Sequence, residues 1–231
     1  MIARAILMLT AAVSMMALAN GAQAAPLVYD FTPPPSGNLG SSEPYTQGAI
    51  TITAFSGTTN GTSTVALGSN VLFGKNSGAD EQGLGVCQAG NNNCNDSNEI
   101  NRQDGVNELV QLDIQNLLAA GYNSFKLNAD SADSSNGGEH LLAYKSNSSA
   151  SLGTLIASMQ SSQNDVSVGD LAGFRYLNFT IDCSANNCTK DALVHSLTAD
   201  KVAVPEPASL ALLGSGLIGM AWAHRRRRNR A

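Results

Sequence analysis

Acidic and amide side chains are concentrated between positions 80 and 113, and their oxygen atoms are the ligands that calcium prefers. The spacing does not match an EF-hand loop, because the middle position lacks glycine and Ile100 stands at a ligand position. Calcium sites on loops need no fixed linear motif, so a calcium site and a solvated acidic loop both remain open. The candidate ligands are Asp80, Glu81, Asp96, Asn98, Glu99, Asp104 and Glu108, with Asp130 and Asp133 as a weaker second group.

The four cysteines are the second group of reactive side chains. In an exported chain an even number of cysteines favours disulfides, and four cysteines allow three connectivities. We expect the pairs Cys87–Cys94 and Cys183–Cys188, because each pair brackets an asparagine-rich turn. Such bridges would rigidify two loops rather than hold the whole fold. Zinc is the alternative, although gaps of six and four residues match the usual zinc knuckle poorly.

Catalytic patterns are sparse. His140 follows Glu139, and His195 lies in a predicted strand, but nothing in the sequence joins either histidine to a nucleophile. The chain has no Gly-x-Ser-x-Gly turn, no phosphate-binding loop and no dinucleotide fingerprint. We therefore predict no catalytic residues and no obligate cofactor, and keep a secreted hydrolase as an alternative. Tyrosine would have to provide any sugar-stacking surface, because the single tryptophan, Trp222, lies in the C-terminal apolar run.

The segment that carries the candidate ligands and the cysteines is predicted to be β-structure. Short β-branched or alternating runs are separated by glycine and asparagine clusters, a pattern typical of an all-β, two-sheet sandwich with a jelly-roll-like arrangement. One short helix is expected over 114–120, ending at Gly121. The predicted strands are 27–32, 49–55, 71–73, 109–114, 124–128, 141–144, 174–181 and 192–202.

The N-terminus has the pattern of a secretory signal peptide. Arg4 precedes an apolar run over 5–19, and the small-residue site Ala22-Gln23-Ala24 follows. We expect residues 1–24 to be removed by a signal peptidase after Ala24, with Ala25 as the alternative position. A buried N-terminal helix is the structural alternative. The domain that remains covers 25–203.

The C-terminus carries a second targeting pattern over 204–231. Val204, Pro205, Glu206 and Pro207 precede an apolar run over 208–223, which predicts a transmembrane helix of about 24 Å. A basic tail over 224–231 follows and should stay in the cytoplasm, so that the domain faces outward. The arginines of this tail are Arg225, Arg226, Arg227, Arg228 and Arg230.

The order and spacing of these three parts resemble the PEP-CTERM sorting signal of Gram-negative bacteria. The resemblance implies that an exosortase, a membrane-embedded cysteine protease, cuts near Pro205–Pro207. It also implies a cell surface rich in exopolysaccharide and biofilm. A membrane anchor that is never cut needs the same helix and arginines, so it remains the alternative.

Charge excludes one class of partner. Residues 26–206 hold seven basic residues and all 18 acidic residues, a formal balance of −11. A domain of this charge repels nucleic acid. We therefore expect an exported, non-enzymatic protein of the cell surface or extracellular matrix, associated with exopolysaccharide. A calcium-dependent carbohydrate-binding module is the alternative.

Overall fold

The computed structural model describes residues 24–32, 37–76, 81–88, 98–103, 105–131, 140–160, 163–182, 191–201, 214–219 and 225–226. The chain divides into two units, of which one is Ala24–Lys201 and the other joins Met1–Gln23 with Val202–Ala231. In the second unit the described residues 214–219 and 225–226 are helical. No helix among the described residues is long and apolar enough to cross a membrane. The predicted signal peptide and most of the predicted helix over 208–223 lie outside the described residues, so both stay predictions.

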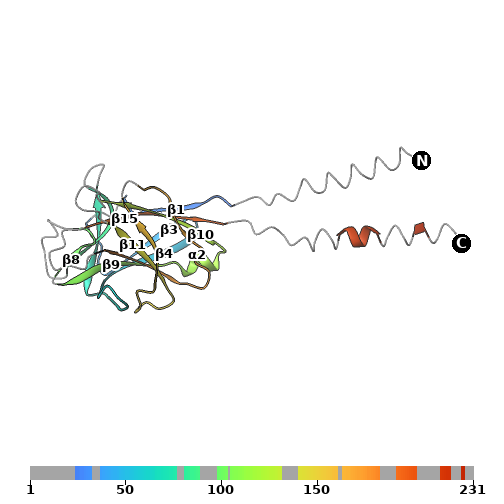
Figure 1. Cartoon of the computed structure of the whole chain (residues 1–231). Coiled ribbons are helices and arrows are strands. Elements are labelled where there is room, and N and C mark those ends of the chain that lie inside the picture. Colours follow the sequence, from blue (N-terminus) through green and yellow to red (C-terminus); the bar gives the residue numbers. More distant parts are fainter. Residues whose placement is uncertain are drawn as a thin grey trace. The chain divides into compact units, whose positions relative to one another are not determined.

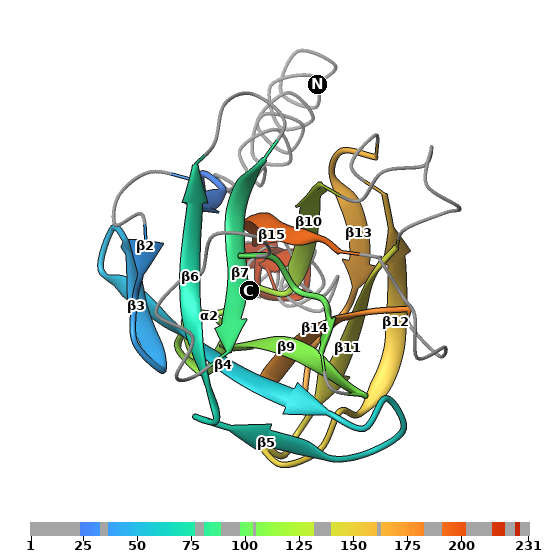
Figure 2. The same ribbon diagram turned by 90° about the vertical axis from the view of Figure 1, so that its left-hand side faces the viewer.

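Ala24–Lys201 is built from two antiparallel sheets (Figures 1 and 2). Sheet A contains β1 (Leu27–Asp30), β2 (Gly37–Asn38), β6 (Asn70–Asn76), β7 (Gln82–Gln88), β10 (Ser124–Asp130), β13 (Val166–Gly169) and β15 (Leu193–Asp200). Its order is β13–β10–β15–β7–β6–β2, and β1 also pairs with β15. The chain crosses between the two sheets repeatedly.

Sheet B contains β3 (Ser42–Gln47), β4 (Ile50–Thr59), β5 (Val65–Leu67), β8 (Arg102–Gln103), β9 (Val106–Asp113), β11 (Leu141–Ser146), β12 (Thr154–Met159) and β14 (Tyr176–Ile181). Its order is β12–β11–β14–β9–β4–β3, with β5 paired to β4 and β8 to β9. The all-β, two-sheet prediction is thus confirmed. A jelly roll has eight strands, whereas these sheets have seven and eight, so the jelly-roll label stays an interpretation.

Strand alternation places the core between the sheets. On β10, Phe125, Leu127 and Ala129 are buried while the residues between them are half-exposed. This period of two is the pattern of a strand with one face on the core. On β14, Leu177, Phe179 and Ile181 pack into the same core. Asn178 and Thr180, which alternate with them on the other face, are buried too, so the outer face of sheet B is covered at this place.

All eight predicted strands exist, with shifted ends, and the predicted helix is α2 (Gln115–Ala119). Gly121 follows α2 with a φ of +85°, which suits glycine at the end of a helix. The sequence did not predict β2, β3, β5, β7, β8, β12 or β13. β7 was missed because Gly83 and Gly85 weaken a strand pattern. Both glycines allow a close backbone approach: a Cβ at Gly83 would lie 2.5 Å from the Val194 carbonyl oxygen, and one at Gly85 would collide with the Asn98 carbonyl.

The first and last strands lie side by side. β1 pairs with β15 in the register Leu27↔Ala199, so residues 24–26 and Lys201 lie at the same end of Ala24–Lys201, which we call the terminal end (Figure 1). The Tyr29 hydroxyl donates to the Ile50 carbonyl at 3.1 Å, which places the start of β4 at this end as well. β4 then runs roughly 30 Å, at about 3.3 Å per residue, to Thr59 at the opposite, distal end.

Candidate functional site

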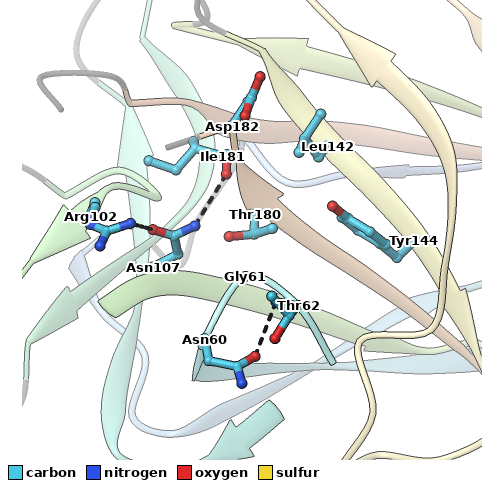
Figure 3. A pocket seen from close by; sticks show the side chains of 10 residues that line it. All are labelled: Asn60, Gly61, Thr62, Arg102, Asn107, Leu142, Tyr144, Thr180, Ile181 and Asp182. Carbon is cyan, nitrogen blue, oxygen red and sulfur yellow. Dashed lines mark hydrogen bonds between the residues drawn. The ribbon is translucent and has the colours of Figure 1, made fainter. Parts of the chain in front are cut away.

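A polar cleft of about 340 Å³ opens at the distal end of sheet B, on the face turned away from the core (Figure 3). It lies where β9, β11 and β14 meet the turn between β4 and β5. None of its residues was among the predicted ligands. The lining residues are Asn60, Gly61, Thr62, Arg102, Asn107, Leu142, Tyr144, Thr180, Ile181 and Asp182.

One wall of the cleft is apolar. Leu142 and Tyr144 stand two residues apart on β11, and therefore project from the same face of sheet B. The Tyr144 hydroxyl points toward the middle of the cleft, opposite Asn107 (Figure 3). Partial burial raises the pKa of this hydroxyl, and the nearby Asp182 carboxylate raises it further. The hydroxyl is therefore a neutral hydrogen-bonding group at every physiological pH.

The opposite wall is polar. The Asn107 amide nitrogen lies 3.4 Å from the Ile181 carbonyl oxygen, and its Oδ1 faces Arg102 Nη1 at the same distance. At the rim, Asn60 Oδ1 accepts hydrogen bonds from the backbone N–H groups of Thr62, Ser63 and Thr64 at 3.1–3.2 Å. Asn60 therefore fixes the turn that borders the cleft, as asparagine does in many turns.

A buried amide pair holds the surface beside the cleft. Gln111 Nε2 donates to Asn178 Oδ1 at 2.7 Å, and Asn178 Nδ2 donates to the carbonyls of Ser151 and Leu152 at 3.1 and 2.9 Å. The segment after β11 is thereby fixed against sheet B. Leu152 then packs with Val65 and Leu109 in a small apolar cluster, against which Tyr144 rests. The apolar wall of the cleft is therefore rigidly supported.

The structure brings two predicted calcium ligands together, around an amine. Lys75 Nζ lies 2.7 Å from Glu81 Oε2 and also contacts Glu99 Oε1, while Ser131 Oγ donates to Glu99 Oε2 at 2.8 Å. Burial alone would lower the pKa of the Lys75 ammonium, but its hydrogen bonds to Glu81 and Glu99 outweigh burial and raise it. The cation that these two carboxylates contact in the structure is therefore the Lys75 ammonium.

The other predicted calcium ligands are placed only in part. Asn98 is described, and its Oδ1 is buried without a hydrogen-bond partner. Among the described residues no group of three or more His, Cys, Asp or Glu side chains is arranged to hold a metal ion. Asp80, Asp96, Asp104 and Asp133 lie outside the described residues, so the calcium site stays a prediction.

Glu108 was also a candidate ligand and is instead deeply buried. Its side chain lies on the core face of β9, 2% exposed, where Oε2 accepts the Asn101 N–H at 3.1 Å and Asn70 Nδ2 lies 3.5 Å from Oε1. Burial raises the pKa of Glu108 to about 8, against the opposing effect of the Asn101 hydrogen bond. The carboxyl group is therefore largely protonated at neutral pH.

Cys87 lies on β7, is 3% exposed and is engaged in a disulfide. The other three cysteines, Cys94, Cys183 and Cys188, lie outside the described residues. The pairing Cys87–Cys94 and Cys183–Cys188 therefore stays a prediction.

Both histidines of the domain have polar neighbours, and among the described residues neither is joined to a complete catalytic set. His140 Nδ1 lies 3.0 Å from Ser158 Oγ, and its Nε2 lies 3.4 Å from the amide of Gln160. A base needs a third group that orients it, usually a carboxylate; Glu139 lies outside the described residues. His195 Nδ1 lies 3.2 Å from the Gln82 carbonyl, an acceptor, so this nitrogen carries the proton. Asp130 Oδ2 lies 3.8 Å from the same nitrogen.

Residues 203–227 match the family model of the PEP-CTERM protein-sorting motif. The match confirms the resemblance based on Pro205, Glu206, Pro207, the apolar run and the arginines. It marks the chain as an exported surface protein that passes a membrane and is sorted by an exosortase. Comparison with curated proteins and with solved structures found no match. Of the sorting signal, only 214–219, Arg225 and Arg226 are among the described residues.

Proposed function

We propose that the chain is a non-enzymatic protein of the cell surface or extracellular matrix that associates with exopolysaccharide in a biofilm. A signal peptidase removes the N-terminal segment, the C-terminal helix holds the precursor in the inner membrane, and an exosortase then cuts near Pro205–Pro207. The observation that carries the proposal is the position of the sorting motif. Its match begins at residue 203, directly after β15 closes the sandwich at Asp200.

The arrangement of the two ends supports this order of events. The first residues of the domain, 24–26, and its last residue, Lys201, both lie at the terminal end. A precursor tethered through either segment would therefore expose the distal end. The polar cleft lies at that distal end, so it would be accessible before and after cleavage.

A hydrolase is the second candidate, because Ser158 and His140 are within hydrogen-bonding distance. We do not favour it, because Ser158 is exposed on an edge strand and the second nitrogen of His140 faces an amide. Substitution of Ser158 by alanine should leave every property of the protein unchanged. Hydrolysis of the host's own polysaccharide that is lost in Ser158→Ala would establish the enzyme instead.

The proposal is tested by fractionating the native host. We expect the wild-type protein in the polysaccharide matrix, and we expect it to be released when that matrix is depolymerised. A variant with Pro205→Ala and Pro207→Ala should accumulate in the cell envelope, and the matched variant Pro33→Ala, near the N-terminus of the domain, should behave as wild type. The proposal would be contradicted if the wild type and the motif variant were divided between matrix and cell envelope in the same proportions.

A further inference from the structure

We propose that the cleft at the distal end of sheet B binds a sugar residue of an uncharged extracellular glycan, and that it does so without calcium. The inference rests on the proposed association with exopolysaccharide and names the surface responsible for it. The ligand class follows from the chemistry of the two walls, the rigidity of the site, its position and its charge.

The two walls of the cleft suit the two kinds of surface on a sugar ring. Leu142 and the ring of Tyr144 offer apolar surface on one side, while Asn107 and Arg102 offer amide and guanidinium groups on the other. A pyranose has C–H groups on its faces and hydroxyl groups around its rim, so it matches a site that is part apolar and part polar. Aromatic rings with a polar end are well suited to such contacts. The volume of about 340 Å³ is at the lower end of the range for small-ligand sites.

The site is held in place before any ligand arrives. Leu142 and Tyr144 are on β11, which pairs on both sides, with β12 and with β14. Tyr144 packs against the small cluster of Val65, Leu109 and Leu152, and Leu152 is fixed by the Asn178 hydrogen bond to its carbonyl. At the rim, three backbone N–H groups converge on Asn60 Oδ1. A preorganised site spends less free energy on ordering its own side chains when it binds.

The charge of the protein selects an uncharged glycan. The lining residues include one cation, Arg102, and one anion, Asp182, so the cleft itself has no excess of positive charge. The whole segment 26–206 has a formal balance of −11, and this field repels polyanions at low ionic strength. A polyuronate would therefore approach against repulsion, whereas a neutral chain would not.

Calcium is not needed at this cleft. Asp182 is the single carboxylate among its lining residues, and calcium takes six to eight oxygen ligands, usually with several carboxylates. Glu81 and Glu99, two of the candidate calcium ligands, contact Lys75 and do not line the cleft. Binding should therefore survive removal of calcium by a chelator.

The test is titration calorimetry on the full-length chain in a detergent without a sugar headgroup. The probes are short cello-, manno- and galacto-oligosaccharides, each with and without EDTA, and alginate oligomers as the polyanion. We expect at least one neutral oligosaccharide to bind equally with and without EDTA. Tyr144→Phe, which removes only the hydroxyl, should weaken this binding by about tenfold, as expected for one lost hydrogen bond. Tyr176→Phe makes the same change on β14 at the other end of sheet B, and should leave binding unchanged.

Three results would overturn the inference: no binding of any neutral probe, binding of alginate alone, or neutral binding that Tyr144→Phe leaves intact. Thermal melts of both variants show whether the fold is kept. None of these results decides whether the protein is sorted and retained in the matrix, because fractionation of the host measures that separately. Retention in the matrix without neutral-glycan binding would reject the cleft and keep the proposed function.

Discussion

Gln111 and Asn178 are opposite each other on β9 and β14, and Gln111 Nε2 donates to Asn178 Oδ1 at 2.7 Å. Both side chains are fully buried on the outer face of sheet B. Asn178 accepts this hydrogen bond and donates from its own amide nitrogen to the carbonyls of Ser151 and Leu152. A polar pair on the face away from the core thus fixes the segment that supports Tyr144, and so links sheet pairing to the shape of the cleft.

Asn178→Ala should destabilise the domain by about 2–4 kcal/mol, because the buried partners of Asn178 would lose their hydrogen bonds. Chemical denaturation measures the change. Asn116→Ala is the matched control, since Asn116 is exposed and donates one hydrogen bond, to the Thr51 carbonyl; its loss should cost about 1 kcal/mol or less. Equal effects for the two variants would contradict the role given to the buried pair.

Lys75→Met should destabilise the domain by about 3 kcal/mol, because it leaves the nearly buried carboxylate of Glu99 without its cation. The double variant Lys75→Met with Glu99→Gln should recover part of that loss, since both charges are then gone. Lys126→Met, a half-exposed position on β10, is the control and should change stability little. Thermal melts compare the stability of the variants. A double variant less stable than Lys75→Met would contradict the buried ion pair between Lys75 and Glu99.

Stability should fall with rising pH because of Glu108. Its pKa is about 8 in the folded chain and 4.5 ordinarily, so the folded state keeps a proton that the unfolded state releases. The contribution of the protonated Glu108 side chain to the free energy of unfolding is complete below pH 4.5. It decreases as the pH rises toward 8, and above that value it is gone. Within this window the free energy of unfolding falls by up to about 1.4 kcal/mol per pH unit.

Glu108→Gln tests this assignment, because glutamine has the same shape and no charge. Urea denaturation at a series of pH values should show a flatter profile for Glu108→Gln between about pH 5 and 8, and higher stability than wild type at the alkaline end. Glu43→Gln, on strand β3, should keep the wild-type slope. A profile for Glu108→Gln that is as steep as wild type would assign the pH dependence to another group.

Gly85→Ala should prevent correct folding of the Asn98 segment, because the new Cβ would collide with the Asn98 carbonyl. Gly48→Ala is the control: nothing lies within 4 Å of a Cβ there, and its φ of +60° costs about 1–2 kcal/mol for a residue with a side chain. Yield and melting temperature of the two variants should therefore differ clearly. A well-folded Gly85→Ala protein would show that the Asn98 segment does not cross β7 so closely.

The sequence predicted the strands that alternate or are rich in branched residues, such as β10 and β14, because one face of each packs into the core. It failed for β7, whose glycines are required by neighbouring backbone, and for edge strands such as β12, whose burial pattern is weak. It also failed for the cleft, because Asn60, Arg102, Asn107, Tyr144 and Asp182 come from separate strands and turns. The sequence singled out none of its tyrosines, and Asn107 on β9 gave no signal before the register of sheet B was known.

The most direct test is the intact mass of the protein recovered from membrane and extracellular fractions of its native host. We predict an extracellular species that begins near Ala25 and ends within Pro205–Pro207. Two disulfides would make it about four hydrogens lighter than its reduced form. A full-length species that still carries Trp222 and the terminal arginines, found in membranes alone, would contradict cleavage by an exosortase.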